Sequence, residues 1–549
     1  MKSAAMSFKE RVANWARLQT IVSILAKHGF SGIVKDLGFG SHPKSEEESE
    51  NGEKQANTPK QLRLAFEELG PTFIKLGQLL STRPDLLPEA YVLEFTKLTD
   101  QIPHFPFSEV LEILEKELGR EPYEIFSFID ENPLAAASIS QVHRARLKDS
   151  EQEVVIKVQR PNIETTIQSD IHILYFVAKT LERLGKNFKL INLHAIVKEF
   201  QRAIHEELDF TLEAKNIDSF RDNFPNLEAI EIPDVIWSFT TKRILTMTEL
   251  KGTPLSHITT IPASIDRKYL AESLVNFFFE SMFFHGLFHA DVHPGNILLI
   301  EEGEGKLGLL DFGMVGTLGT DLRQKLSKIF MATVSRDFET LSQTYIEIGE
   351  FGKKFSVREF QADISEFLAP HLGKPLREIN VGELLLDSTR IARKFQVKLP
   401  RDLIMFYRSL VTLEHIGRKL DPDFEFITYG QKFAKTLLKR RFSSEEIVRD
   451  VFKMLEGLRS LGTEFPSQLK HLLQKIENDE IGLSAEALQP IVNEFKRTQK
   501  IQALSFLSFC FLMTATLMSI FKPEHFFVWS LWIFSLMSVG ILIKMLFKN

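Results

Sequence analysis

The sequence predicts an α+β fold of two lobes, preceded by a helical extension and followed by an apolar helical hairpin. Three features indicate this arrangement. Segments rich in β-forming residues gather between residues 125 and 159, residues 322 to 498 read as helices, and two long uncharged segments end the chain. A chain of 549 residues is also too long for one hydrophobic core and suggests several domains.

Composition excludes several classes of protein. The net charge is −6, and no dense basic stripe with interleaved aromatic residues occurs, so we expect no nucleic-acid partner. The single cysteine, Cys510, excludes a disulfide framework and a thiolate metal cluster, which suits a reducing, cytosol-facing body. The N-terminal stretch mixes charged with apolar residues and does not read as a secretory signal.

Two acidic motifs lie close together between residues 286 and 313. His289-Ala290-Asp291 followed by Asn296 has the spacing of a kinase catalytic loop, and Asp311-Phe312-Gly313 is a DFG motif. Phosphates need hard divalent cations with oxygen ligands, so we assign Asn296 and Asp311 to Mg²⁺ and Asp291 to orienting or deprotonating the attacking group. The pair of motifs predicts a protein-kinase-like two-lobed fold that binds ATP with Mg²⁺.

Three regions precede the small lobe. Residues 1–40 form an amphipathic helical region, which either lies at a membrane interface or packs on the protein body. Residues 41–60 are charged and lack apolar periodicity, which predicts a disordered linker. Residues 61–120 form a helical extension that carries Lys75, Gly77 and Gln78 after a helix start at Pro71, and then a helix from Ser108, its expected N-cap, to Leu118.

The small lobe is predicted to cover residues 121–250. Its first strands are expected at residues 125–129, 141–147 and 153–159, with Lys157 on the last of them facing the α- and β-phosphates of ATP. Alanines occupy the place of the glycine-rich loop of ordinary kinases, so the backbone cannot approach phosphate as closely. The residues concerned are Ala135, Ala136, Ala137, Ser138 and Ile139.

The remainder of the small lobe holds a candidate partner for Lys157. The helical stretch 191–224 contains several acids, among them Glu207, Asp209 and Glu213, and one of them should pair with the lysine. Strands at 230–237 and 243–247 should then close the lobe. The segment from Met247 to Leu250 reads as the hinge, where the backbone around Glu249 would meet adenine.

Residues 251–498 are predicted to form a helical large lobe that begins with a helix from Arg267 to His285. No room for an activation segment is left after Gly313. Residues 499–549 hold two uncharged segments, 501–521 and 526–543, each long enough to cross roughly 30 Å of hydrocarbon. Basic residues flank both, which predicts a multi-pass protein of the cell inner membrane with both termini and the kinase-like body in the cytoplasm.

With these residues in hand, the chain resembles the UbiB family of atypical, protein-kinase-like ATPases. The resemblance covers roughly residues 61 to 426, and the two apolar segments at the end resemble those of bacterial members. The linker at 41–59 departs from the family pattern. The resemblance is carried by FIKLGQLLSTRPDLLP, PLAAASISQVHRA, VVIKVQRP, EELDF, FHADVHPGNILL, LLDFG and RDLIMFYRSLVTLEHIGRKLDPDF.

The resemblance implies further roles. The element from Lys75 to Gln78 would fold over the site where a peptide substrate docks, Glu207 and Asp209 would contact it, and Glu213 would pair with Lys157. Family members support the biosynthesis of ubiquinone or related isoprenoid quinones by coupling ATP hydrolysis to the handling of lipid precursors. We therefore expect membrane lipids and quinone precursors as partners, and leave open other quinone-biosynthesis proteins and a homodimer.

Two alternatives have to be weighed against this function. A protein or small-molecule kinase acting in trans would use the same phosphate site, but it fits poorly with the missing activation segment and with Ala290 where many kinases place arginine. A non-catalytic nucleotide-binding scaffold would be expected to have lost Asp291, Asn296 or Asp311, and all three are present.

Overall fold

The computed structural model divides into a unit from Met1 to Leu438 and a unit from Lys439 to Asn549. The predicted disordered linker falls almost wholly outside the described residues, as does most of the second unit. The structure describes residues 8–31, 34, 59–81, 87–98, 103–184, 193–225, 227–335, 337–349, 356–372, 380–395, 397, 399–441, 508–509, 511–513, 532–537 and 539.

The small lobe is built on an antiparallel sheet in which β1 (Phe126–Ile129), β3 (Ser140–Leu147), β4 (Glu153–Gln159) and β6 (Ile244–Thr248) lie in that order, while β2 (Ala135–Ala136) pairs with β3. The three strands predicted at 125–159 are thus confirmed. Helices α6 (Phe107–Leu118) and α7 (Pro122–Ile125) pack on this sheet through a core of aliphatic residues and phenylalanines. Ser108 is not the N-cap of α6, because Pro106 holds that position and Ser108 already lies in the first turn.

The strand expected at 230–237 is mostly absent. Only Ile230 and Glu231 form a strand, β5, and it pairs in parallel with β10 (Lys306–Leu309) of the large lobe rather than with the small-lobe sheet. Pro233 lacks the N–H that a ladder requires, so β5 cannot continue through it. Val235 makes an isolated bridge to Met247, and a 3₁₀ turn follows at Trp237–Phe239.

The helical stretch predicted at 191–224 is two helices. α9 (Leu193–Glu207) ends before Asp209, whose side chain accepts a hydrogen bond from the amide of Thr211 and so caps α10 (Phe210–Asn223). An aspartate whose oxygen satisfies an orphan N–H in this way starts a new helix. The break turns α10 so that Glu213 faces β4.

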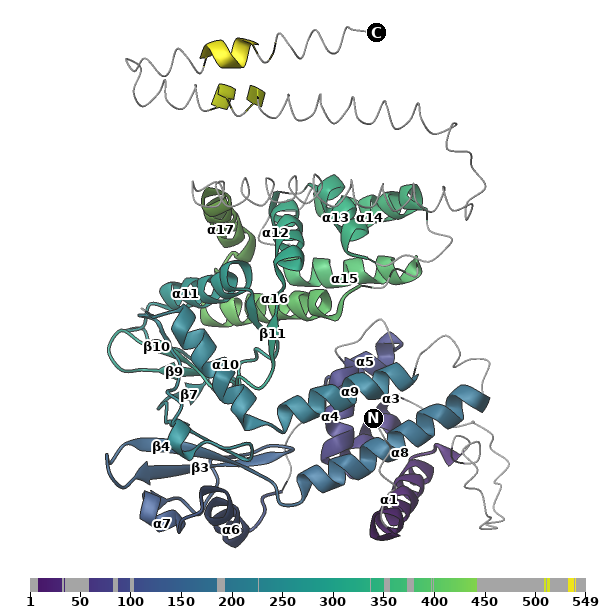
Figure 1. Cartoon of the computed structure of the whole chain (residues 1–549), viewed down its shortest axis with the longest axis vertical. Coiled ribbons are helices and arrows are strands. Elements are labelled where there is room, and N and C mark those ends of the chain that lie inside the picture. The colour runs from purple at the N-terminus through teal and green to yellow at the C-terminus, as the bar shows by residue number, and fades with distance from the viewer. Residues whose placement is uncertain are drawn as a thin grey trace. The chain divides into compact units, whose positions relative to one another are not determined.

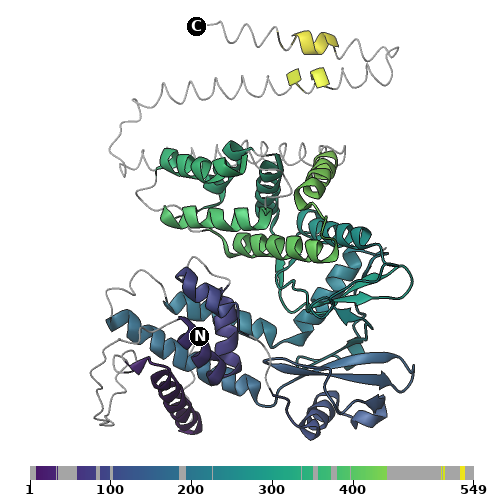
Figure 2. The same cartoon turned by 180° about the vertical axis from the view of Figure 1, so that it is seen from behind.

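The N-terminal helices form the extension, and Figures 1 and 2 show them beside α8 (Ile163–Leu184) and α9. Helix α1 (Phe8–Lys27) packs on the protein body, because Leu18 and Ile21 are buried and Arg17 pairs with the fully buried Asp170 of α8 at 2.7 Å. The extension also contains α3 (Pro59–Leu69), α4 (Pro71–Ser81) and α5 (Glu89–Phe95), and α4 begins at Pro71 as expected.

The large lobe opens with α11 (Arg267–Glu280), which continues as one π-helical turn, η2 (Ser281–His285). One small sheet of this lobe has the order β5, β10, β9 (Ile297–Ile300), β7 (Thr253–Pro254). In a separate two-stranded sheet, β11 (Val315–Thr317) pairs with β8 (Leu287–His289). The described part of the lobe continues with six helices: α12 (Thr320–Ser335), α13 (Phe338–Ile348), α14 (Val357–Leu372), α15 (Val381–Lys394), α16 (Arg401–Leu420) and α17 (Phe426–Arg441).

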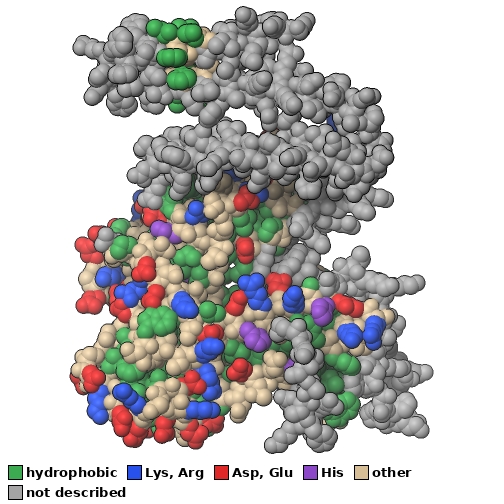
Figure 3. Space-filling model, viewed as in Figure 1, with side chains coloured by type: hydrophobic (Ala, Val, Ile, Leu, Met, Phe, Trp, Pro, Cys, Tyr) green, Lys and Arg blue, Asp and Glu red, His purple; other side chains and the backbone are tan. Residues whose placement is uncertain are grey.

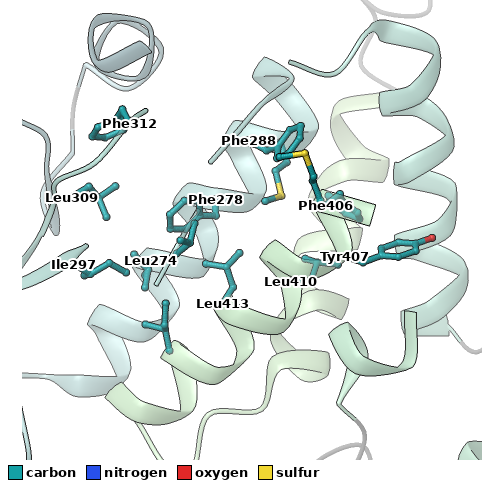
Figure 4. Packing of buried hydrophobic residues seen from close by; sticks show 14 of the residues in the cluster. Leu274, Phe278, Phe288, Ile297, Leu309, Phe312, Phe406, Tyr407, Leu410 and Leu413 are labelled. Atoms are coloured by element: carbon teal, nitrogen blue, oxygen red, sulfur yellow. The ribbon is translucent and has the colours of Figure 1, made fainter. Parts of the chain in front are cut away.

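The core of the large lobe joins the helices to the strands that flank the acidic motifs. Figure 4 shows Leu413 of α16 beside Leu274 and Phe278 of α11, with Ile297 and Leu309 of the small sheet on their other side, and Phe406 and Leu410 further along α16. All seven residues are buried, with 2 % exposure or less. Because α16 packs through this core, the helices at the end of the lobe support the strands that carry the acidic motifs.

The expected localisation has to be corrected. In the part of the chain that the structure describes, no helix combines the length and the apolar character needed to cross a membrane. This contradicts a multi-pass inner-membrane protein. The two segments on which that expectation was based, 501–521 and 526–543, lie for the most part outside the described residues.

Candidate active site

Lys157 and Glu213 form an ion pair between the sheet and α10. Lys157 lies in the middle of β4, opposite Val142 of β3 and Leu245 of β6, so its backbone is fixed from both sides. Its Nζ donates hydrogen bonds of 2.9 and 2.8 Å to the two carboxylate oxygens of Glu213. The predicted pairing is confirmed, and it is not solvated, because the lysine side chain is 14 % exposed and the glutamate 5 %.

The electrostatics of this pair keep the lysine charged. Desolvation lowers the pKa of Lys157, but the negative charges of Asp311 and Glu213 more than offset it and raise the pKa above its ordinary value. Desolvation also raises the pKa of Glu213, an effect that the charge of Lys157 opposes. The ring of Phe210, the first residue of α10, lies 5.3 Å from Nζ of Lys157 and adds a cation–π contact.

Asp311 follows β10 and faces the same lysine. Its Oδ1 accepts a hydrogen bond of 2.8 Å from the amide of Gly313, and its Oδ2 lies 3.9 Å from Nζ of Lys157. Desolvation raises the pKa of Asp311, but the charge of Lys157 and the Gly313 hydrogen bond outweigh it and lower the pKa to about 2. This carboxylate is therefore ionised, and its side chain is 43 % exposed and open to a ligand.

Phe312 is buried beneath α10. Its ring centroid lies 5.3 Å from that of Phe220 and 5.4 Å from the imidazole of His289, and Asn216 donates a hydrogen bond of 2.9 Å to its carbonyl. Figure 4 shows the side chain on the Leu309 side of the core. Phe312, the middle residue of the DFG motif, thus connects α10, which carries Glu213, to the segment after β10 that carries Asp311.

His289 connects the two acidic motifs. Its Nε2 donates a hydrogen bond to the carbonyl of Asp311, and its Nδ1 accepts one of 3.3 Å from the amide of Asp291. Burial lowers the pKa of this histidine and so favours the neutral ring that both bonds require. Asn296 completes the loop, because its Nδ2 donates to the carbonyl of Asp291 at 3.4 Å.

The ligand set fits a magnesium ion shared with phosphates. Asn296 uses its Nδ2 on the backbone, which leaves its carbonyl oxygen to face a cation, and Asp311 is an ionised carboxylate. Among the described residues, no cluster of three or more His, Cys, Asp or Glu side chains could hold a metal on its own. One carboxylate and one amide oxygen are enough only where substrate phosphates and water complete the shell.

The Lys75 element lies against α9. Lys75 of α4 makes an ion pair of 2.6 Å with Glu207, and its charge is close enough to contribute to the lowered pKa of Asp311. Gly77 is buried, and a Cβ there would come within 2.2 Å of Leu98. The carbonyl of Gln78 accepts a hydrogen bond from Ser81. Glu207 therefore contacts Lys75 as the family resemblance implied, whereas the interactions recorded for Asp209 cap α10.

The alanine-rich stretch forms a tight hairpin between β2 and β3. Ala135 and Ala136 pair with Val142 and Gln141, and the amide of Ala137 donates to the carbonyl of Ser140 at 2.8 Å. Ser138 and Ile139 occupy the buried turn. At the predicted hinge, the amide of Glu249 donates a hydrogen bond of 3.1 Å to the carbonyl of Glu153, which leaves the amide occupied.

Sequence reasoning gave no role to three residues that support the site. His289 was counted only as part of a motif. Ser409 of α16 donates a hydrogen bond of 3.1 Å to the carbonyl of His289 and so joins the helical lobe to the catalytic loop. Burial lowers the pKa of the neighbouring Arg408, and the negative charge of Asp291 partly offsets this effect. Arg408 and Ser409 lie in one of the segments that carry the family resemblance, and that was the only signal for them in the sequence.

The geometry around Lys157 and Asp311, in a fold whose chain runs from Gly313 through β11 directly into α12, defines the class of protein as atypical kinase-like. Comparison with known proteins agrees. Residues 97–345 match the model of the ABC1 atypical kinase-like domain, and residues 364–425 match that of the UbiB helical domain.

Named relatives make the assignment more specific. The "Probable protein kinase UbiB" of Marinobacter nauticus is 34 % identical over 420 residues, which are 76 % of this chain and 77 % of the relative. That of Cellvibrio japonicus is 34 % identical over 443 residues, or 80 % of each chain. The chain belongs to the UbiB family. A solved structure of Rv3197 with erythromycin from Mycobacterium tuberculosis is 25 % identical, with a TM-score of 0.46 over 66 % of this chain and 91 % of that one.

Proposed function

We propose that the chain binds Mg²⁺–ATP beside Lys157, hydrolyses it, and thereby supports ubiquinone biosynthesis by acting on lipid precursors of the quinone. The observation that carries the proposal is the buried Lys157–Glu213 ion pair, held 3.9 Å from the ionised Asp311. A buried lysine that is fixed and fully charged next to an exposed carboxylate suits the binding of phosphates and their cation.

In this proposal each residue acts through one interaction. Lys157, oriented by Glu213, binds the α- and β-phosphates. Asn296 and Asp311 hold Mg²⁺, which supplies charge neutralisation for the phosphates when bound. Asp291 is exposed and held by His289 through its amide, so its carboxylate is available to orient the attacking water. The alanine-rich hairpin and Glu249 would contact the nucleotide from the small lobe.

The acceptor side favours a lipid precursor over a peptide. Lys75 and Glu207 make a direct ion pair with side chains only 16 % and 23 % exposed, and the charge of Lys75 contributes to the lowered pKa of Asp311. In the proposal, α4 covers the surface on which a peptide substrate would dock and regulates access through Lys75, Gly77 and Gln78. Family membership supports the assignment to quinone metabolism.

The nucleotide site is tested by calorimetry with Mg²⁺–ATP. Asp311→Asn keeps the shape of the side chain but removes the charge of the metal ligand, so we expect Mg²⁺-dependent binding to be lost. Asp321→Asn, at an 81 % exposed side chain of α12, is the matched control and should bind as the wild type does. An unchanged affinity of Asp311→Asn would remove this residue from the metal site.

The pathway is tested by the lipid profile of cells that lack the chain. We expect a quinone precursor to accumulate, and its chemical structure would identify the step. Complementation with the wild type should clear the precursor, whereas Asp311→Asn should not. A normal quinone content in cells lacking the chain would contradict the proposed pathway without affecting the nucleotide site.

A further inference from the structure

The alanine-rich turn is held from behind by Arg160, the residue that follows β4. Its Nε donates a hydrogen bond of 3.0 Å to the carbonyl of Ala137, and its backbone amide donates one of 2.9 Å to the carbonyl of Ile139. These two bonds fix both sides of the turn. Because Arg160 continues the strand that carries Lys157, the turn and the phosphate-binding lysine share one rigid support.

The same guanidinium reaches the segment that leads into α6. Its Nη1 donates a hydrogen bond of 2.9 Å to the carbonyl of Pro103, and its Cζ lies 5.7 Å from the ring centroid of Phe105. Gln141 of β3 fixes the backbone of Phe105, since its Oε1 accepts from the amide at 3.0 Å and its Nε2 donates to the carbonyl at 3.4 Å. In chain order, this segment links the Lys75-bearing extension to the small lobe.

The turn itself contains polar groups that its conformation does not satisfy. Ser138 and Ser140 are fully buried, and in the described part of the chain neither hydroxyl has a hydrogen-bond partner. Buried hydroxyls without partners oppose the conformation that buries them. The turn therefore depends on external contacts, and the planar guanidinium of Arg160, with hydrogen bonds on two edges and an aromatic ring beside it, supplies them.

We propose that Arg160 is a positioning residue that sets the distance between the alanine-rich turn and the bound nucleotide, and that couples this turn to the segment from the extension. The inference deepens the proposed function, because it assumes that the turn faces the phosphates of ATP. Arg160 itself touches backbone carbonyls and Phe105, so it acts through the turn and takes no part in the reaction.

If Arg160 had only a structural role, its loss would lower the stability of the protein without changing the KM for Mg²⁺–ATP. A positioning role instead predicts that loss of Arg160 raises the KM for Mg²⁺–ATP while kcat changes little, because Lys157, Asp291 and Asp311 remain in place. Arg160→Lys keeps a cation beside Phe105 but cannot bond both Ala137 and Pro103, so it should restore part of the affinity.

The experiment compares Arg160→Ala, Arg160→Lys and Arg146→Ala in the full chain. Arg146 is the matched control, because it lies on β3 of the same sheet, is 45 % exposed, and its guanidinium makes long ion pairs with Glu151 and Glu153, at 3.8 and 3.9 Å. Hydrogen exchange at the Ala137 amide, measured without nucleotide, reports the turn directly. We expect about tenfold faster exchange and about tenfold higher KM in Arg160→Ala, an intermediate result in Arg160→Lys, and no change in Arg146→Ala.

The outcomes separate this inference from the function on which it rests. A wild type that neither binds nor hydrolyses Mg²⁺–ATP overturns the proposed function. An active wild type with unchanged exchange and KM in Arg160→Ala, or with a fall in kcat alone, overturns the role of Arg160. If Arg160→Ala does not fold, Arg160→Lys keeps a cation beside Phe105 but loses the paired hydrogen bonds to Ala137 and Pro103. Arg160→Lys then decides the matter, since a folded Arg160→Lys protein with wild-type exchange and KM contradicts the positioning role.

Discussion

Two buried charges, on Lys157 and Glu213, stabilise each other at the point where β4 meets α10. Each carries a desolvation cost that its partner helps to offset, so replacing either one leaves a buried charge without its direct counter-ion. His143 shows the opposite arrangement. It is fully buried and must stay neutral, because its Nδ1 donates to the carbonyl of Asp130 while its Nε2 accepts from Gln141.

The ion pair predicts similar losses from changes on either side. Lys157→Ala and Glu213→Lys should each lower kcat/KM for ATP hydrolysis roughly 100-fold, because both leave the phosphates without an oriented cation. Glu206→Lys changes an exposed acid of α9 that pairs with Arg202 on the surface, and it should retain wild-type activity. Full activity of Glu213→Lys would contradict the pairing as a functional unit.

The neutral state of His143 predicts a pH dependence of stability. Burial lowers the pKa of this imidazole below its ordinary value of 6.5, and the charge of His104 adds to the effect. The unfolded chain therefore binds the proton more readily, so the stabilisation is complete above about pH 6.5 and is lost as the pH falls through the folded-state pKa. The measurement is the difference in thermal midpoint between wild type and His143→Gln.

Other histidines, His289 among them, titrate in both proteins, so the comparison between the two proteins isolates His143. The gap between their midpoints should narrow as the pH is lowered from 7.5 to 5.5. A gap that does not change with pH would show that His143 is protonated equally in the folded and unfolded states.

At this scale the sequence predicted the residues whose chemistry is specific. A lysine among β-branched residues and the acids around a DFG become specific when they occur together, so Lys157, Asp291, Asn296 and Asp311 could be named as candidates from the sequence. Arg160 was not, because an arginine after a strand is common and its partners are backbone carbonyls far away in the chain. Asp209 was read as a contact of Lys75, although its spacing before Thr211 also fits an N-cap.

Helices α15 and α16 show how closely the elements of the large lobe pack. A Cβ on Gly382 of α15 would lie 2.4 Å from the backbone nitrogen of Val411 on α16. Glu414 of α16, 1 % exposed, accepts a hydrogen bond of 3.4 Å from the amide of Gly382. Since Ser409 on α16 also bonds the catalytic loop, the packing of this helix pair bears on the site.

Gly382→Ala should push the two helices apart. The obstacle is backbone, which cannot rotate away as a side chain can, so we expect a loss of about 1–3 kcal/mol in the free energy of unfolding. Chemical denaturation measures it. Gly319→Ala adds the same methyl group before α12 where nothing lies within 4 Å, and it should be nearly neutral. Equal stability of the two variants would contradict the close approach.

The elements that the sequence predicted well are those with local signals. Alternation and β-branching located β3 and β4, and apolar periodicity located α6 and α11. The prediction of a strand at 230–237 was wrong, because alternation of apolar residues does not show which strand a segment pairs with. β5 pairs with a strand more than seventy positions later, and Pro233 ends it. The break between α9 and α10 was missed because both sides are helix-forming.

For the whole molecule, the N-terminal extension is a structural part of the kinase-like body. Arg17 of α1 binds the carboxylate of Asp170 on α8 with two nitrogens, at 2.7 and 2.9 Å, and also donates to the carbonyl of Leu69 at 2.8 Å. One side chain thus connects three helices. On the face shown in Figure 3, basic and acidic side chains are interspersed over the described surface.

Arg17→Ala should destabilise the body more than its partly exposed position suggests. Asp170 is fully buried and would remain without its counter-ion, which costs roughly 3 kcal/mol. Differential scanning calorimetry should show the lower midpoint. Arg202→Ala removes an arginine that is 82 % exposed, and it should shift the midpoint little. A similar small shift for Arg17→Ala would mean that α1 is dispensable.

The sequence left open whether α1 packs on the body or lies at an interface, since both use the same apolar stripe. Its amphipathic pattern shows which residues are buried but not what buries them. The buried Asp170, far along the chain, decided the matter in the structure. The expectation of a multi-pass membrane protein rested on segments of apolar composition alone, and composition does not establish a spanning helix.

The DFG motif lies between two paired strands, and this has a consequence for the design of inhibitors. β10 precedes Asp311 and pairs with β9, while β11 begins two residues after Gly313 and pairs with β8. Between them, Phe312 is fully buried against Phe220 and His289. A compound that displaced this phenylalanine would have to move a buried ring in a short segment whose two ends are fixed by strand pairings. Screening should therefore favour small molecules that compete for the adenine position and leave Phe312 where it lies.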